Sequence, residues 1–241
     1  MSGHSHAKKI RREKEITDQK RGQVFSKLLR EISVFAREGG DPNTNTKLRL
    51  AMEKAKQWNL PKENIERAIK KGSDEPAGEK LKEIVCEAYG PGGTAIIIEG
   101  ITDNKNRALG EIKQILAKRG GKLASEGSVK WLFERKGVIE VGSRKYEDKK
   151  KEDLELIAIE AGAEDIYWHD DILDLYTKPE DLEKVKKNLE EKGIKSESAS
   201  LGWVEKKEVS LDEKTKESCQ KLFDDLDENE AVQDIYSNLK D

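Results

Sequence analysis

The sequence has few of the residues that build membrane spans, disulfide frameworks or catalytic triads. No purely apolar run is longer than that of residues 95–98, which is far too short to cross a bilayer, and the N-terminus has no apolar stretch typical of a secretory signal. Only two cysteines occur, Cys86 and Cys219, without the spacing of a disulfide framework or a metal site. We therefore expect reduced thiols and a cytoplasmic protein that has no membrane partner.

Histidine is equally scarce, and this scarcity argues against enzymatic activity. His169 is the only histidine after His6, so no Ser/His/Asp or Cys/His catalytic arrangement can be assembled. His4 and His6 have no neighbouring third or fourth ligand for a metal ion. We expect a protein without catalytic residues, metal, cofactor or small-molecule substrate.

Charge, by contrast, is abundant and unevenly distributed. Charged residues make up 39% of the 241 residues, against about a quarter in ordinary globular domains, and hydrophobic residues make up 34%. Residues 1–71 hold 18 basic and 9 acidic side chains, whereas residues 72–241 hold 28 basic and 40 acidic ones. The length favours two or three small domains, and the basic first segment indicates an anionic partner, which we take to be nucleic acid.

The basic segment begins with a cationic arm and continues into three short helices. The arm carries five cations, namely Lys8, Lys9, Arg11, Arg12 and Lys14. Apolar residues at three- and four-residue spacing over 24–35, 48–58 and 65–69 predict amphipathic helices that form a small bundle. Asn45 is expected to cap the second helix, and Gly72 is expected to end the third.

One flank of the first helix carries cations away from its apolar face. At 100° per residue, the same side of this helix holds Lys20, Lys27, Arg30 and Arg37, and Arg21 follows the first of them. A solvated helix face is the commoner explanation for such a pattern, but continuity with the arm favours a surface that contacts nucleic-acid phosphates. We predict that these five residues and the five arm cations bind nucleic acid.

The remaining chain alternates predicted strands and helices after a polar linker at residues 73–80. Strands are expected at residues 84–89, 94–101 and 129–133, with a helix over 109–116 before the last of them. From residue 137 the pattern is β-α-β-β-α-β, the ferredoxin-like order. A helix near residues 211–223 and a strand at 232–237 would then complete the α/β domain that began at residue 80.

We therefore predict an α+β protein with an N-terminal helical bundle followed by two ferredoxin-like α/β domains, one inserted in the other. The basic arm and helical domain is expected at residues 1–72. The split α/β domain is expected at residues 80–136 together with 206–241, and the inserted domain at residues 137–205.

Two further motifs permit a functional and a structural interpretation. Residues 90–93 (Gly-Pro-Gly-Gly) lack the Lys and Ser/Thr of a phosphate-binding loop, so a tight turn between strands is favoured. A candidate second polar site, for RNA or ribosome contact, consists of Asp103, Asn104, Asn106 and Arg107. We favour a structural role, in which Asn106 or Asp103 caps the next helix and Arg107 pairs with a neighbouring acid.

Core packing is expected for the four tryptophans, Trp58, Trp131, Trp168 and Trp203.

Several motifs, taken in order, resemble the YebC family of bacterial proteins and their mitochondrial relatives. Two of them are Arg21-Gly22-Gln23-Val24-Phe25-Ser26-Lys27-Leu28 and Glu87-Ala88-Tyr89-Gly90-Pro91-Gly92-Gly93. Further matches lie at residues 2–5, 30–32, 39–42, 64–72, 102–107 and 127–129. The resemblance is dense over residues 2–137 and collinear beyond them, and the order of the motifs makes it specific.

The resemblance implies an N-terminal helical domain and two α/β domains, one inserted in the other. It also implies a probable transcriptional regulator that binds promoter DNA. Other members, including the mitochondrial translational activator of cytochrome oxidase, act on translation at the ribosome. A DNA-binding regulator and a ribosome-associated translation factor that contacts ribosomal RNA both stay open, because phosphate contacts carry no base information. A protein-binding scaffold is a third interpretation, which would require exposed sheet edges.

Overall fold

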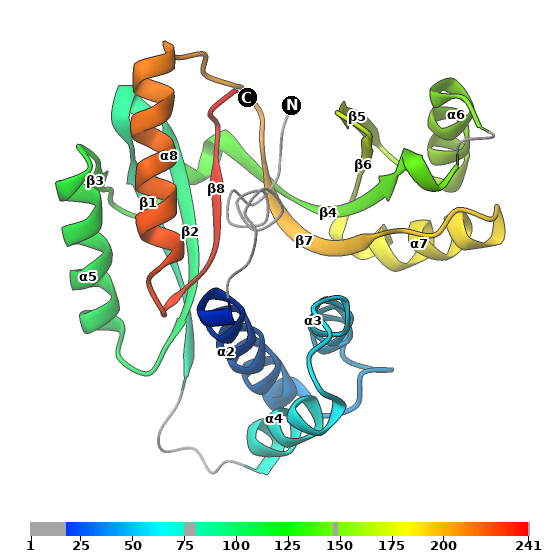
Figure 1. Cartoon of the computed structure of the whole chain (residues 1–241), viewed down its shortest axis with the longest axis horizontal. Helices are drawn as coiled ribbons and strands as arrows, with labels where there is room; N and C mark the ends of the chain where they lie inside the picture. The colour runs from blue at the N-terminus through cyan, green and yellow to red at the C-terminus, as the bar shows by residue number, and fades with distance from the viewer. Residues whose placement is uncertain (1–17, 75–80, 147–148, 241) are drawn as a thin grey trace. The chain divides into compact units, whose positions relative to one another are not determined.

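The computed structural model describes residues 18–74, 81–146 and 149–240, which form α-helices and β-strands in both halves of the chain (Figure 1). The helices are α2 (Asp18–Phe35), α3 (Thr46–Gln57), α4 (Lys62–Asp74), α5 (Lys105–Lys118), α6 (Lys151–Ala161), α7 (Leu182–Glu191) and α8 (Glu213–Asp227). The strands are β1 (Lys82–Tyr89), β2 (Ala95–Thr102), β3 (Lys122–Leu123), β4 (Phe133–Gly142), β5 (Asp165–His169), β6 (Ile172–Thr177), β7 (Ser198–Glu205) and β8 (Val232–Ser237).

Helices α2, α3 and α4 form the small bundle that the apolar spacing predicts. Asn45 caps α3 by accepting a hydrogen bond from the backbone N–H of Leu48 at 3.0 Å, as expected. Its side-chain amide also donates to the carbonyl oxygens of Phe35 and Gly39, so it ties the end of the first helix to the start of the second. The buried residues of the bundle include Leu28, Ile32, Leu48, Ala51, Ala55, Ile65 and Ala68.

Gly72 lies inside α4 rather than at its end, so the prediction that this glycine ends the helix is wrong. A β-carbon at residue 72 would lie 2.1 Å from the carbonyl oxygen of Ser33 and 2.9 Å from the β-carbon of Ala36. Both of these residues belong to the segment that α4 packs against. The two helices can therefore approach this closely only because residue 72 has no side chain.

The first sheet has the strand order β3-β1-β2-β8, and all of its neighbouring strands are antiparallel. The strand predicted at Val232–Ser237 is confirmed, and Ile235 lies opposite Ile98 in the register of β8 and β2. Helices α5 and α8 contribute Ile112 and Leu222 to the core beneath this sheet. The C-terminal strand therefore packs beside segments far earlier in the sequence (Figure 1).

The glycine-rich motif between β1 and β2 forms the tight turn that the sequence favours. The backbone N–H of Gly90 donates to the carbonyl oxygen of Thr94 at 2.8 Å, which closes the turn between the two antiparallel strands. Gly92 and Gly93 have φ values of 67° and 79°, a region that side chains disfavour. Glycine is therefore required here by backbone geometry.

The second sheet is built from residues 133–205 and has the strand order β5-β6-β4-β7. Its elements follow one another as β-α-β-β-α-β, with α6 and α7 packed against the strands and against each other. The strand predicted at residues 129–133 is wrong. Lys130–Leu132 form a short 3-10 turn, and the strand begins at Phe133 and continues without a break to Gly142.

The α+β class is confirmed by the mixture of helices with two antiparallel sheets. The described residues divide into two compact units, of which one comprises residues 132–208 with Lys240 and the other comprises residues 18–131 and 209–239. The helical bundle thus belongs to the same unit as the first sheet. The three-domain division expected from the sequence, with boundaries near residues 72, 136 and 205, stays a prediction.

A buried carboxylate on β1 anchors the segment that leads to β4. Glu87 is 5% exposed and accepts backbone hydrogen bonds from Gly127 and Val129, both at 2.6 Å, and from Lys130 at 2.9 Å. Burial alone would raise the pKa of Glu87, but the three N–H donors outweigh it and hold the pKa below its ordinary value. Two of the motifs behind the family resemblance therefore meet in space.

Gly72→Ala is expected to lower the free energy of unfolding by about 1–3 kcal/mol, because the added methyl group would overlap the carbonyl oxygen of Ser33. Gly22→Ala is the matched control, since nothing lies within 4 Å of a β-carbon at this exposed position of α2. The control should stabilise the protein by roughly 0.5–1 kcal/mol. Urea unfolding measures both variants, and equal effects would contradict the close approach at Gly72.

Glu87→Gln is expected to lower the free energy of unfolding at neutral pH by about 1–3 kcal/mol, because an amide cannot accept all three backbone hydrogen bonds. Since the folded-state pKa of Glu87 lies below its ordinary value, the carboxylate stabilises the fold above that value and loses this effect as the pH falls through the folded-state pKa. The difference in stability between wild type and variant should therefore shrink as the pH falls from 7 to below the folded-state pKa.

Urea unfolding at a series of pH values measures this difference. Glu83→Gln is the control, because Glu83 is exposed on the same strand and its substitution removes the same charge. It should change the free energy of unfolding by less than about 0.5 kcal/mol at each pH. A Glu87→Gln effect that is constant with pH would show that the anchor does not depend on ionisation.

Candidate nucleic-acid interface

The predicted nucleic-acid-binding residues fall into an arm and a helix flank. Lys8, Lys9, Arg11, Arg12 and Lys14 lie outside the described residues, so their role stays a prediction. On α2, Arg21 is exposed, and its guanidinium lies 5.4 Å from the centre of the Phe25 ring, a cation–π contact. Lys20 is half-buried in the first turn that the structure describes. These two cations adjoin the point where the arm enters the helix.

Lys27 differs from the sequence prediction, which placed it on a flank away from packed surfaces. It is 5% exposed, and its ammonium group lies 3.1 Å from the Asp227 carboxylate at the end of α8. It also donates a hydrogen bond to the main-chain carbonyl of Asp227. The expected solvent exposure of Lys27 is wrong because Asp227, at the C-terminal end of α8 and far along the sequence, contacts this side of α2.

Arg30 and Arg37 also contact acceptors within the same unit. Arg30 donates to the main-chain oxygen and to the carboxylate of Glu230, each at 2.8 Å, and this hydrogen bond and charge hold the pKa of Glu230 below its ordinary value. Arg37 donates to the carbonyl oxygen of Leu81. The binding of phosphates by these residues stays a prediction, and a phosphate would share each guanidinium with acceptors that it already has.

A third cation of the bundle, after Lys27 and Arg30, contacts an acidic side chain within residues 227–234. Lys54 on α3 lies 3.2 Å from Glu31 and 3.5 Å from Asp234. We call Asp227, Glu230 and Asp234 the acidic strip. The strip neutralises part of the positive charge of α2 and α3 within the molecule.

Sequence reasoning missed the exposed cations in the second half of α4, which are Arg67, Lys70 and Lys71. Their signal is present in the sequence, because at 100° per residue Arg67 and Lys70 lie away from Ile65 and Ala68, the buried residues of this helix, and Lys71 lies at the edge of that buried face. Exposed acids share this helix, and one of them, Glu66, pairs with Lys62 at 3.4 Å.

The candidate second polar site adopts the structural role that we favoured, with a different capping residue. Asn104 caps α5 by accepting a hydrogen bond from the backbone N–H of Arg107 at 3.1 Å, so the assignment of Asn106 or Asp103 as the cap is wrong. The predicted pairing of Arg107 with an acid is confirmed, since its guanidinium lies 2.7 Å from Asp103. All four residues are exposed, and a recognition role for them stays a prediction.

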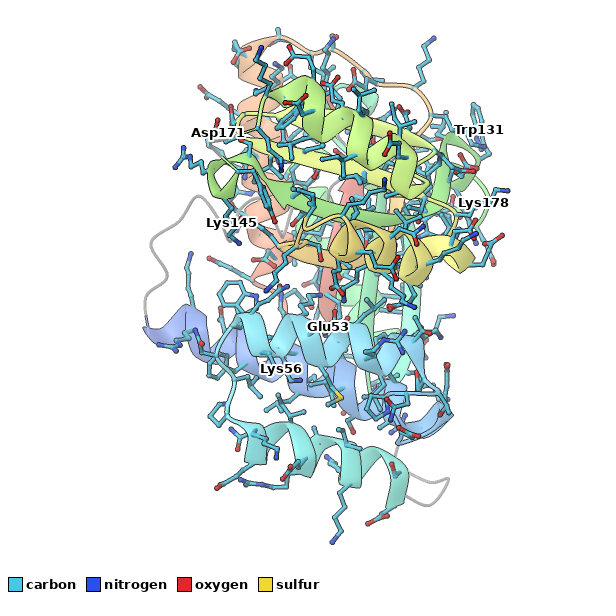
Figure 2. The ribbon with its side chains drawn as sticks, turned by 90° about the vertical axis from the view of Figure 1, so that its right-hand side faces the viewer. Glu53, Lys56, Trp131, Lys145, Asp171 and Lys178 are labelled. Carbon is cyan, nitrogen blue, oxygen red and sulfur yellow. The ribbon has the colours of Figure 1, made fainter. Side chains whose placement is uncertain are left out.

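Trp131 contradicts the expectation that every tryptophan packs in a core. It is 66% exposed, and its indole N–H donates to the carbonyl oxygen of Ser128 at 3.0 Å, which fixes the ring at the surface (Figure 2). Its carbonyl acceptor belongs to the segment that Glu87 anchors. Trp58, Trp168 and Trp203 are half-buried.

Both cysteines are free and buried, and burial raises the pKa of each thiol.

Across residues 18–74, 81–146 and 149–240, no three His, Cys, Asp or Glu side chains are grouped to hold a metal ion. None of the helices within these ranges has the length and apolar character that crossing a bilayer demands.

The fold and the candidate interface define an α+β protein in which a cation-rich helical bundle precedes two antiparallel sheets. Residues 5–75 match the family described as "TACO1/YebC protein N-terminal domain", and residues 81–239 match "TACO1/YebC second and third domain". The chain belongs to the TACO1/YebC family, which confirms the resemblance seen in its motifs.

Similar proteins include two bacterial relatives of nearly the same length. The "Probable transcriptional regulatory protein" of Persephonella marina is 49% identical over 243 residues, which cover 100% of this chain and 96% of the relative. The "Probable transcriptional regulatory protein TTE1135" of Caldanaerobacter subterraneus is 45% identical over 241 residues, with 100% and 98% coverage. The crystal structure of the "Conserved Hypothetical Protein Aq1575" from Aquifex aeolicus is 44% identical, with a TM-score of 0.85 over 92% of this chain and 91% of that chain.

Lys27→Met is expected to lower the free energy of unfolding by about 1–3 kcal/mol, because it leaves the largely buried Asp227 carboxylate without its ammonium partner. The double variant Lys27→Met with Asp227→Leu should recover part of this loss, since both charges are then removed. Lys20→Met is the control on the same helix and should change stability by less than about 0.5 kcal/mol. Urea unfolding compares the three variants, and a Lys27→Met protein as stable as wild type would contradict the packing described for this pair.

Proposed function

We propose that this protein is a non-enzymatic regulator of gene expression that binds DNA through its basic N-terminal part in the cytoplasm. The observation that carries the proposal is the group of exposed cations on α4, Arg67, Lys70 and Lys71. These cations lie in a segment, residues 1–71, with 18 basic and 9 acidic side chains. The names of the relatives, probable transcriptional regulatory proteins, support a regulatory role.

The proposed mechanism is electrostatic attachment to the phosphate backbone. Each cation that neutralises a phosphate releases a condensed counterion, so affinity falls as salt rises. The proposed phosphate contacts also include Lys20 and Arg21 on α2 and the cations of the arm. Lys27 is committed to Asp227, whereas Arg30 holds an exposed partner, Glu230, whose side chain is 80% exposed. Exposed ion pairs contribute little stability, so a phosphate can replace the partner of Arg30 more readily than that of Lys27.

A second candidate is a ribosome-associated translation factor whose cations contact ribosomal RNA. The exposed ring of Trp131 favours it, because single-stranded RNA is commonly held by stacking of its bases on aromatic side chains. Gel-shift titration on promoter fragments and co-sedimentation with ribosomes at the same salt concentration separate the two candidates. Ribosome association without binding to the fragments would replace DNA as the target, and the reverse would favour transcription.

The equilibrium constant for binding duplex DNA should fall as the salt concentration rises. A plot of its logarithm against the logarithm of the salt concentration should have a slope of about −4.5 to −7, as expected for roughly five to eight phosphate contacts. Replacing four arm cations by Gln should make the slope less steep by about 3 to 4, because each contact contributes about 0.9. These four residues are Lys8, Lys9, Arg11 and Arg12. Fluorescence anisotropy titrations at several salt concentrations measure the slope.

The matched control removes the same number of positive charges from exposed positions of the other compact unit. Its four lysines, each changed to Gln, are Lys145, Lys150, Lys184 and Lys187. The control should leave the slope within about one unit of the wild-type value, since these residues make no proposed phosphate contact. A flat salt dependence of the unaltered protein would remove phosphate contacts from the proposal.

A further inference from the structure

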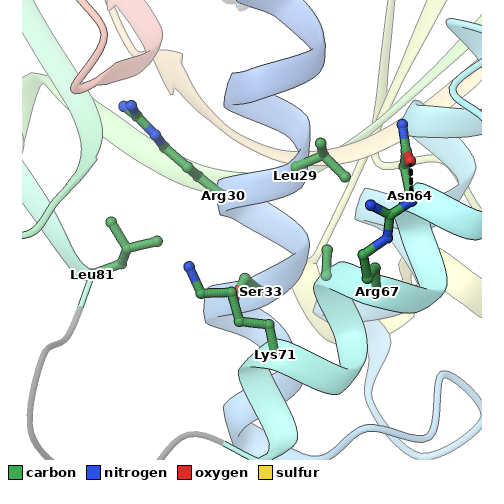
Figure 3. Close-up of a pocket in the computed structure, with 8 residues that line it drawn as sticks. Leu29, Arg30, Ser33, Asn64, Arg67, Lys71 and Leu81 are labelled. Carbon is green, nitrogen blue, oxygen red and sulfur yellow. Dashed lines mark hydrogen bonds between the residues drawn. The ribbon is translucent and has the colours of Figure 1, made fainter.

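A pocket of about 440 Å³ lies in the helical bundle, between α2, α4 and the start of β1 (Figure 3). Helix α2 lines it with Leu29, Arg30 and Ser33, and α4 lines it with side chains that include Arg67 and Lys71. The volume lies in the range of roughly 300–1,000 Å³ typical of small-ligand sites. The pocket is distinct from the α2 contacts with the acidic strip, although Arg30 borders both.

The wall of the pocket carries a buried hydroxyl, that of Ser33. Ser33 is 4% exposed, and its Oγ has no hydrogen-bond partner among the residues that the structure describes. Buried side-chain polar atoms in folded proteins are bonded in the large majority of cases, so this hydroxyl indicates a missing partner. Because Ser33 lines the pocket, a bound ligand can supply that partner.

The charged side chains of the pocket select an anion. Arg67 and Lys71 are one helical turn apart on α4, and both are exposed (Figure 3). The guanidinium of Arg67 donates to the side-chain oxygen of Asn64 at 3.1 Å, which orients it at the pocket wall. None of the described residues that line the pocket is acidic. Arginine and lysine together with a hydroxyl donor are suited to a phosphate group.

The lining also has an apolar part, which a bare phosphate ion would leave without contacts. Leu29, Ala68 and Leu81 contribute apolar side chains beside the cations. A nucleotide combines a phosphate with a base whose face can pack on such a surface. A duplex keeps its bases stacked inside the helix, so only a single-stranded or unstacked nucleotide can place its base and phosphate in the pocket together.

We propose that this pocket binds one nucleotide of a single-stranded nucleic acid. The phosphate accepts hydrogen bonds from Arg67, Lys71 and the hydroxyl of Ser33, and the base packs against Leu29 and Leu81. The inference rests on the proposed nucleic-acid-binding function and adds to it the state of the strand and the residues that hold it.

The test is titration of the full-length protein with oligo(dT) of about eight nucleotides and with a duplex of equal length, followed by fluorescence anisotropy. Ser33→Ala should lower single-strand affinity about threefold or more without lowering stability, because the hydroxyl makes no hydrogen bond inside the described protein. Arg67→Gln combined with Lys71→Gln should lower it about tenfold or more. Neither variant should weaken duplex binding beyond the effect of lost charge.

The matched control is Lys56→Gln combined with Lys62→Gln, which removes the same charge from exposed positions that do not line the pocket (Figure 2 labels Lys56). It should lower single-strand affinity less than about threefold. Equal losses from the two pairs, with unchanged binding by Ser33→Ala, would overturn the pocket and leave the proposed function intact. Failure of the unaltered protein to bind either strand form would overturn the proposed function itself.

Competition experiments with small ligands test two alternatives to a nucleotide within a strand. One is a site for phosphate alone, and the other is a site for a free mononucleotide. At equal ionic strength, thymidine monophosphate should displace oligo(dT) at lower concentration than inorganic phosphate does, because it also covers the apolar wall. Equal potency of the two competitors would reduce the pocket to an anion site and overturn the nucleotide assignment. Thymidine monophosphate that binds tighter than the oligomer would overturn the assignment to a strand.

Discussion

The close packing of α2 against α4 at Gly72 is the constraint on which the rest of the helical bundle depends. A side chain at residue 72 would meet the carbonyl oxygen of Ser33 at 2.1 Å, so the helices can share this approach only through glycine. The approach fixes which side of α2 each residue presents to α4. Ser33 consequently lies on the wall of the pocket, and Lys27 lies on another side of the helix, where it contacts Asp227 at the end of α8.

The two sides of the bundle differ in how their positive charge is balanced. Lys27 and Asp227 are 7% and 20% exposed at their side chains, and breaking a pair of this kind leaves a poorly solvated charge. Arg30 and Glu230 are 32% and 80% exposed, so water and salt weaken their attraction and a phosphate can compete for the arginine. None of the described residues that line the pocket beside Arg67 and Lys71 is acidic. The bundle therefore contacts α8 and β8 through partly buried charge, whereas Arg67 and Lys71 stay exposed.

The elements of the bundle and the sheets could be predicted because their signals are local. The apolar spacing gave α2 to α4, and Asn45 and the strand at Val232–Ser237 occur where expected. Gly72 was misassigned because a glycine after two lysines looks the same whether it ends a helix or permits a close approach. Lys27 was misassigned because a helical wheel describes one helix and contains no information about α8, some 200 residues later.

The pocket could not be predicted for the same reason, since its lining comes from α2, α4 and the start of β1. Ser33 and Lys71 are far apart in sequence, and neither is unusual for an amphipathic helix. Only their juxtaposition turns an ordinary serine into a buried hydroxyl without a partner beside exposed cations. Charge counts along the chain correctly point to the N-terminal segment as the cationic part, but net charge averages over both sides of each helix. The proposed phosphate contacts depend on which cations packing leaves exposed, and this does not follow from composition.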